Sequence, residues 1–117
     1  TITEQLASAS QSLIDLYNAL EAACIGFGGD VQVKKTLKLY IAFKRLKNFA
    51  SVEVQANANQ LIVYVKVDPA DIIIEDGFTR DVSDIGHWGT GDLEIKIRNH
   101  ADLEKAIPLL QKSYGAS

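Results

Sequence analysis

The spacing of apolar residues changes twice along this chain, and that change restricts the fold more than any other feature of the sequence. From Leu6 to Cys24, apolar residues recur about every 3.6 positions, which is the period of an amphipathic helix. From Val31 onward they alternate with polar residues, as in a strand with one buried face. The helical period returns after Asn99. The sequence therefore predicts terminal helices on either side of a set of strands.

The N-terminal helix is predicted to begin at Thr1, because Thr1 and Glu4 have the spacing of a capping box. Its end is predicted at the glycines of residues 26–29, where the backbone can reverse. The last helix is predicted to begin after Asn99, with an apolar stripe of Leu103, Ala106, Ile107, Leu110 and Tyr114. Pro108 removes a backbone hydrogen bond from this helix, so we expect a kink or two shorter helices.

Strands are predicted where the alternation is clear, and their short connections make neighbouring strands antiparallel. They cover residues 31–44, 49–55, 61–67 and 93–97. The apolar face of the first strand carries Leu37, Leu39, Ile41 and Phe43. After the third strand, Asp68 and Pro69 indicate the start of a short helix, with one apolar turn at residues 72–74.

These elements fit an α+β fold of two layers, with an antiparallel sheet of four or five strands and both terminal helices on its apolar face. The other face then carries mainly polar residues: Lys38, Tyr40, Lys44, Ser51, Glu53, Gln55, Tyr64, Lys66, Glu94, Lys96 and Arg98. We expect a single domain over residues 1–117. Because the chain has no methionine and starts at Thr1, we expect it to be a piece of a longer protein.

The composition excludes a membrane-spanning or secreted class. No segment approaches the ~18 consecutive apolar residues of a membrane span, and the N-terminus lacks the order of a secretion signal. The single cysteine, Cys24, cannot form an internal disulfide, which agrees with a reducing compartment. We therefore expect a cytoplasmic protein without membrane contact. Cys24 is interpreted as a small core residue, with a reactive thiol as the alternative.

Charge is unevenly distributed, although the net charge is only −3. Residues 31–66 contain seven basic residues and one acid, a net +6, whereas residues 67–104 contain ten acids and three bases, a net −7. The basic residues and nearby tyrosines form a predicted basic face: Lys34, Lys35, Lys38, Tyr40, Lys44, Arg45, Lys47, Tyr64 and Lys66. Such a face suits the phosphates of a nucleic acid, because released counterions favour binding. The alternative is an ordinary solvated surface.

Residues 81–92 form the most unusual segment, with the only tryptophan, three glycines and three carboxylates in twelve residues. The predicted ligand or partner loop consists of Arg80, Asp81, Asp84, His87, Trp88, Thr90 and Asp92. One interpretation is structural, with glycines that allow close backbone approach. A second is a pocket for a small ligand or partner. A third is a metal or general-base site at Asp81, Asp84, His87 and Asp92, although a lone histidine is a weak signature and no metal or cofactor is assigned.

Several runs resemble a bacterial and archaeal family of uncharacterised domains, some of them labelled "predicted transport protein". They are Leu39-Tyr-Ile-Ala-Phe-Lys-Arg, Asn48-Phe-Ala-Ser-Val-Glu-Val, Leu61-Ile-Val-Tyr-Val-Lys-Val-Asp, Arg80-Asp-Val and Gly86-His-Trp-Gly-Thr-Gly-Asp. The resemblance implies a domain that stands alone or lies at the C-terminus of larger proteins, some with a nuclease-like N-terminal domain. It supplies no catalytic residues, and the sequence offers no membrane span to support transport.

Three hypotheses about function follow. The first is an accessory binding module that contacts nucleic acid or a protein through its basic face and the 81–92 loop. The second is a small enzyme or metal-dependent site in that loop. The third is a structural domain that self-associates, as a homodimer, through a sheet edge or exposed aromatic residues.

Overall fold

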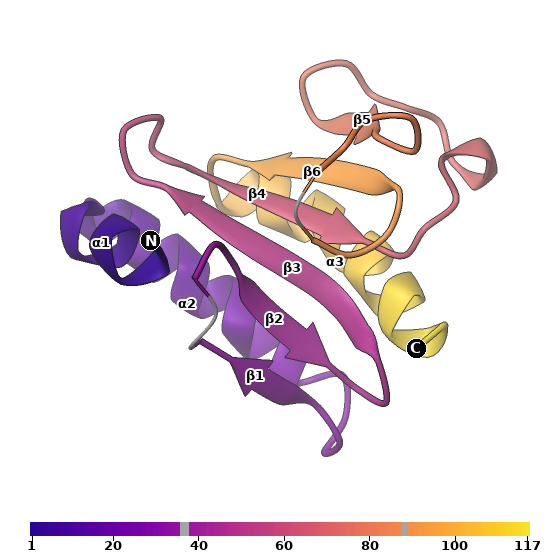
Figure 1. Ribbon diagram of the computed structural model, residues 1–117, viewed down its shortest axis with the longest axis horizontal. Coiled ribbons are helices and arrows are strands. Elements are labelled where there is room, and N and C mark those ends of the chain that lie inside the picture. Colours follow the sequence, from indigo (N-terminus) through magenta and orange to yellow (C-terminus); the bar gives the residue numbers. More distant parts are fainter. Residues whose placement is uncertain (36–37, 88) are drawn as a thin grey trace.

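The computed structural model describes residues 1–35, 38–87 and 89–117 (Figure 1). Its helices are α1 (Ile2–Ser8), α2 (Gln11–Ile25) and α3 (His100–Gly115), with a short 3-10 helix, η1 (Pro69–Asp71). Its strands are β1 (Gln32–Lys34), β2 (Ile41–Lys44), β3 (Asn48–Gln55), β4 (Gln60–Val65), β5 (Thr79–Asp81) and β6 (Leu93–Ile97).

The described strands form one antiparallel sheet in the order β1-β2-β3-β4-β6-β5. This confirms the predicted α+β class. The sheet has six strands rather than four or five, because the predicted first strand divides into β1 and β2 and because β5 was not predicted. Strand β5 is only three residues long, which is too short for a clear alternation of apolar and polar residues.

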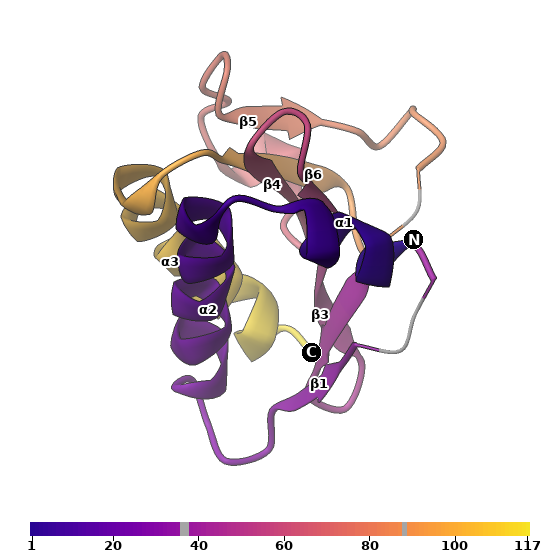
Figure 2. The ribbon, with the colours of Figure 1, turned by 90° about the vertical axis from the view of Figure 1, so that its left-hand side faces the viewer.

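Helices α2 and α3 cover one face of the sheet, and the loop after β5 lies on the other side (Figure 2). Paired residues of neighbouring strands project together toward the helices, for example Ile41, Val52, Val63 and Ile95, which are all fully buried. The opposite face, without a helical layer, is called the open face below. Two layers around one core are thus established, with the open face left for polar residues.

The N-terminal helix is divided, contrary to the prediction of a single helix. The capping box of Thr1 and Glu4 is present at the start of α1, as predicted. A second cap follows at Ser10, whose side-chain oxygen accepts a hydrogen bond from the backbone nitrogen of Leu13 at 3.1 Å. Because an N-cap residue has an extended backbone, Ser10 ends the first helix and begins α2.

The predicted strand over residues 31–44 was also wrong in its middle part. Ile41 and Phe43 are buried as expected, but Leu39 is 41% exposed and Leu37 lies outside the described residues. The carbonyl of Lys38 accepts a hydrogen bond from the backbone nitrogen of Ile2 at 3.0 Å. The backbone here therefore bonds to α1 instead of continuing the ladder of the sheet.

Two expectations about helical segments were wrong. The 3-10 helix after Asp68 ends at Asp71, and Ile72 is already extended, so residues 72–74 do not form an apolar helical turn. The last helix, α3, begins at the predicted cap Asn99 and continues through Pro108 without interruption. Pro108 and Glu104 both lie on the exposed side of α3, so water can reach the carbonyl that lacks its usual backbone donor.

Candidate functional site

A row of paired residues crosses the open face from β2 to β5. In order across the sheet it consists of Ala42, Ser51, Tyr64, Glu94 and Arg80. The residues on β2 and β3 are small and fully buried, whereas those on β4, β6 and β5 are large and polar or charged. The small residues leave room on the sheet for another segment to lie against it.

The loop between β5 and β6 occupies that room. The hydroxyl of Ser51 donates a hydrogen bond to the hydroxyl of Thr90 at 3.0 Å. A Cβ atom on Gly89 would lie 2.9 Å from the Tyr64 ring, and one on Gly91 would lie 2.2 Å from the carbonyl oxygen of Val65. Residues 89–91 therefore lie so close to the sheet that the two glycines are required by packing.

Tyr64 is enclosed by this loop. The ring of His87 stacks on the Tyr64 ring, with 4.5 Å between centroids and 15° between planes. Val82, at the start of the loop, is buried together with Ile62 and Tyr64 in a small apolar cluster on the open face. The loop is thus anchored by Val82 at its beginning and by residues 89–91 near its end.

Glu94 connects the loop-covered region to the edge of the sheet. Its carboxylate accepts hydrogen bonds from the Tyr64 hydroxyl at 3.2 Å and from Arg80 Nη2 at 2.8 Å and Nε at 3.2 Å. The Glu94 side chain is only 12% exposed. Burial, with the nearby carboxylates of Glu53 and Glu94, raises the pKa of the Tyr64 hydroxyl, so this phenol stays protonated and donates.

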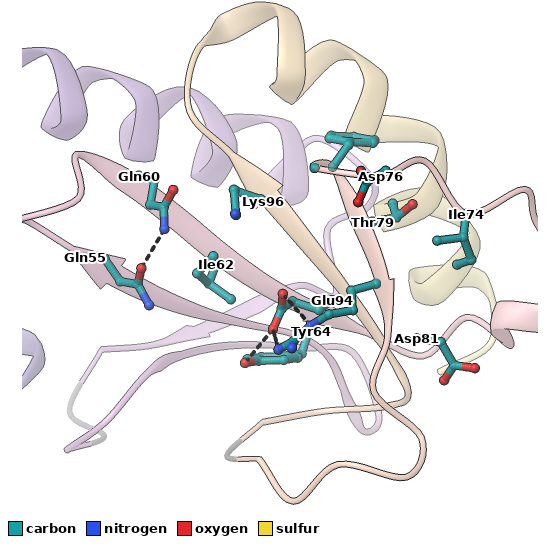
Figure 3. Close-up of a pocket in the computed structure, with 13 residues that line it drawn as sticks. Gln55, Gln60, Ile62, Tyr64, Ile74, Asp76, Thr79, Asp81, Glu94 and Lys96 are labelled. Carbon is teal, nitrogen blue, oxygen red and sulfur yellow. Dashed lines mark hydrogen bonds and ion pairs between the residues drawn. The ribbon is translucent and has the colours of Figure 1, made fainter.

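A shallow cavity of about 720 Å³ lies beside this network (Figure 3). Arg80, Tyr64 and Glu94 line it together with Lys96, and Gln60 donates a hydrogen bond to Gln55 at 2.7 Å at its other end. Its lining contains donors, acceptors and both signs of charge. Such a surface is suited to a polar group rather than to an apolar molecule.

Glu53 lies on the neighbouring strand and is affected by the same network. Partial burial raises the pKa of its carboxyl group and the charge of Glu94 adds to this, whereas His87 opposes it. A carboxyl whose pKa is raised in the folded protein binds its proton more tightly there than in the unfolded chain. Ionisation of Glu53 therefore lowers the stability of the fold as the pH rises above about 4, the ordinary value for glutamate.

We expect Glu53→Gln to increase the free energy of unfolding at pH 7, because the variant avoids burial of a charge near Glu94. The gain should shrink as the pH falls and vanish below about pH 4, where the wild-type side chain is also neutral. Urea unfolding between pH 4 and pH 7 measures the effect. Glu104→Gln, at an exposed site on α3, is the matched control. A gain that is the same at every pH would contradict this assignment.

The predicted basic face does not stay together. Lys34, Tyr40 and Lys44 line one shallow hollow of about 320 Å³ on β1 and β2. Lys35 instead forms an ion pair with Glu21 of α2 at 2.9 Å. Arg45 is also absent from the lining of this hollow.

Arg45 forms an ion pair with Asp30 at 2.9 Å, and its guanidinium lies 4.5 Å from the centre of the Tyr114 ring. Of the remaining basic residues, Lys47 is exposed in the turn between β2 and β3, and Lys66 is half-buried just after β4. Lys38 lines a different hollow, which also contains Glu53. The structure therefore brings together three of the predicted basic-face residues, with the others dispersed.

Comparison with known proteins identifies the family of this chain. The chain matches the domain of unknown function DUF5655 over residues 2–117. It belongs to this family. A curated protein from Haemophilus influenzae, described as an uncharacterized protein, is 28% identical over 111 residues, which are 95% of this chain and 36% of that protein. The chain thus spans about a third of the length of this relative. No solved structure matches it significantly.

The four residues considered for a metal or general-base site, Asp81, Asp84, His87 and Asp92, are all within the described part of the DUF5655 domain. Residues 1–35, 38–87 and 89–117 contain no group of three or more His, Cys, Asp or Glu residues placed to hold a metal ion. The Asp81 carboxylate instead accepts hydrogen bonds from the backbone nitrogen and hydroxyl of Ser83. Asp84 is exposed, and the backbone oxygen of Asp92 accepts from Val82. Trp88 lies outside the described residues.

Two further expectations about the DUF5655 domain can be compared with the structure. Cys24 is fully buried, and burial, with the charge of Glu21, raises the pKa of its thiol to about 12. The core interpretation is therefore preferred to a reactive thiol, which needs a lowered pKa. Within the described part of the chain, no helix is long and apolar enough to cross a membrane.

Sequence reasoning did not identify Glu53, Glu94 and Ser51 as site residues. All three were expected on the open face, because they alternate with apolar residues in their strands. Their association with the 81–92 loop depends on β4 lying between β3 and β6, which the sequence does not specify. The alternation thus predicts that these residues lie on the open face, whereas their grouping near the loop follows from the strand order.

Proposed function

We propose that the DUF5655 domain is an accessory binding module of a longer cytoplasmic protein and that it contacts nucleic acid through the β1–β2 part of its open face. The observation that carries the proposal is the grouping of Lys34, Tyr40 and Lys44 around one hollow. The length of the Haemophilus influenzae relative supports a longer protein, and the buried free thiol of Cys24 agrees with a reducing compartment.

Charge and shape at this hollow suit a phosphate backbone. Lys34 and Lys44 are exposed, and neither forms an ion pair with any residue that the structure describes. Their ammonium groups are therefore available to displace counterions from phosphates. Tyr40 is half-buried in the lining of the same hollow and offers a ring on which a base of a single strand can stack.

The 81–92 loop contributes to the proposed contact surface indirectly. It covers Ser51 and Tyr64 next to the hollow, and the Glu94 side chain beyond them is only 12% exposed. The charge of Glu94 is also offset by its ion pair with Arg80, whereas the exposed carboxylates of Asp81, Asp84 and Asp92 belong to the loop and do not line the hollow. The β1–β2 part of the open face then presents its lysines without a competing acid in the same hollow.

We expect Lys44→Glu to weaken binding of a fluorescein-labelled 20-nucleotide single strand about tenfold at low salt, because one phosphate contact is replaced by repulsion. Fluorescence anisotropy over a salt series should also show that the slope of log affinity against log salt falls by about 1. Lys112→Glu, an identical charge change on α3, is the matched control and should have little effect.

The anisotropy measurements test the proposed surface, nucleic-acid binding itself and the preference for a single strand. Equal losses for Lys44→Glu and Lys112→Glu would show that only net charge is sensed and would overturn the proposed surface. Absence of binding to single-stranded and double-stranded probes at low salt would overturn the nucleic-acid function itself. Preference for the duplex would contradict the stacking role assigned to Tyr40.

A further inference from the structure

An apolar groove lies at the opposite edge of the sheet from the lysine hollow. It runs between the segment before β5 and the second half of α3, and it has a volume of about 510 Å³. Its apolar lining consists of Ile72, Ile73, Ile74, Phe78, Pro108 and Leu109. Strand β5 is the edge strand here, as β1 is at the other edge, so the two surfaces are separate.

The isoleucines of this groove are unusually exposed. Ile73 has 94% of its surface exposed and Ile74 has 41%, although they follow one another in the chain. Exposed apolar residues that occur singly are ordinary, but an apolar groove with adjoining exposed isoleucines is typical of a contact surface between proteins. Three consecutive isoleucines are normally buried in the core of a protein, so their exposure here is not expected from the sequence.

The groove is held in shape by its own backbone and side chains. The backbone nitrogen of Glu75 donates to the Thr79 hydroxyl at 2.8 Å, and the backbone nitrogen of Thr79 donates to the carbonyl of Glu75 at 2.9 Å. Lys105 of α3 forms an ion pair with Glu75, and its ammonium lies 4.2 Å from the centre of the Phe78 ring. These contacts fix the segment to α3, so a ligand need not order it.

The charge around the groove indicates what kind of partner it accepts. Residues 68–79 contain four acids, Asp68, Asp71, Glu75 and Asp76, and no basic residue. Lys105 is the cation in the lining, and it is already paired with Glu75. Asp71 directly precedes the lining residue Ile72, and Asp76 directly follows the lining residue Glu75; both are exposed, so carboxylates flank the apolar lining along the chain and favour apolar side chains flanked by cations.

We propose that this groove binds an extended segment of a protein partner that carries aliphatic side chains flanked by lysine or arginine. The aliphatic groups pack on Ile73, Ile74 and Leu109, and the flanking cations interact with Asp71 and Asp76. This interaction is independent of nucleic-acid binding, because the two surfaces lie at opposite edges of the sheet. The domain would then connect a nucleic acid to a second protein.

The test uses a fluorescein-labelled 14-residue peptide in which leucine alternates with lysine, and a second peptide with glutamate in place of lysine. We expect saturable binding of the lysine peptide and at least tenfold weaker binding of the glutamate peptide. Ile73→Ser with Ile74→Ser should weaken binding of the lysine peptide at least tenfold, whereas Asp71→Asn with Asp76→Asn should weaken it several-fold and reduce its salt dependence.

Leu46→Ser is the matched control, because Leu46 is 82% exposed in the turn between β2 and β3, at the other edge of the sheet. Thermal unfolding of each variant verifies that it is folded. Equal losses for Leu46→Ser and the double isoleucine variant would overturn the proposal, as would equal binding of both peptides. A dimer in light scattering that Ile73→Ser abolishes would assign the groove to a second copy of this chain and overturn the heterologous partner. Lys44→Glu should leave peptide binding unchanged.

Discussion

Replacement of Gly91 by alanine is expected to lower the free energy of unfolding by about 3 kcal/mol or more. The backbone of Gly91 has φ +75°, which side chains other than glycine rarely adopt. An added Cβ would also lie 2.2 Å from the carbonyl oxygen and 2.6 Å from the carbonyl carbon of Val65. Since Val65 belongs to the central strand β4, its backbone cannot move without disturbing the ladder with β3 and β6. Urea unfolding of the two proteins measures the difference.

Two other glycines allow the effect of the backbone conformation to be measured apart from the effect of the steric clash. Gly77 has φ +80° but open space around its Cα, so Gly77→Ala should cost only about 1 kcal/mol from the backbone conformation. Gly86 has neither feature, so Gly86→Ala should change stability by less than about 0.5 kcal/mol. If Gly91→Ala cost no more than Gly77→Ala, the close approach of the loop to β4 would be refuted.

The same geometry concerns residues 89–91, for which the sequence left three interpretations open. The glycines and threonine of residues 89–91 were compatible with a structural loop, a ligand pocket or a metal site. Their contacts with Ser51, Tyr64 and Val65 account for all three residues by packing and one hydrogen bond. Packing and one hydrogen bond thus explain these three residue types without a ligand, and the polar side chains of Glu94 and Arg80 lie beside them.

The spacing of the apolar residues predicted most of the fold, because residues that face the core recur with the period of their helix or strand. The alternation located β3 and β6 within one residue and gave the correct face for Ile41 and Phe43. It did not reveal the break at Ser10, because the apolar spacing continues across this residue. The break is marked instead by the Ser10 hydroxyl, which caps α2 by accepting a hydrogen bond from the backbone nitrogen of Leu13. Similarly, Leu39 fits the alternation but is exposed, since the neighbouring backbone bonds to α1.

The candidate site was less predictable, because it depends on contacts between distant segments. Charge along the sequence placed Lys35 and Arg45 on the basic face, but each has an acidic partner elsewhere, Glu21 and Asp30 respectively. A count of charges cannot identify such pairs before the helices are placed on the sheet. The proposed nucleic-acid surface therefore relies on Lys34 and Lys44, which have no ion-pair partner among the described residues, and such residues are identified only after folding.

Ser113 illustrates the same limit within the core. The apolar stripe predicted for the last helix included Tyr114, yet Ser113 is the fully buried residue there and Tyr114 is only half-buried. The Ser113 hydroxyl donates a hydrogen bond to the carbonyl of Phe49 at 2.5 Å and accepts one from the backbone nitrogen of Lys66 at 2.8 Å. Phe49, which precedes Ala50, and Lys66, which follows Val65, lie directly beyond the last pair of the β3–β4 ladder, Ala50 and Val65. The serine thus bridges the two strands where their own pairing stops.

We expect Ser113→Ala to lower the free energy of unfolding by about 2 to 3 kcal/mol, because it leaves the Phe49 carbonyl and the Lys66 amide without partners next to the core. Urea unfolding measures the loss, and faster hydrogen exchange of the Lys66 amide would locate it. Ser117→Ala is the matched control. Its hydroxyl bonds to the Ser113 carbonyl at the end of the helix, where water can replace it, so a change within about 0.5 kcal/mol is expected. Equal effects of the two substitutions would show that α3 is held to the sheet by its apolar residues alone.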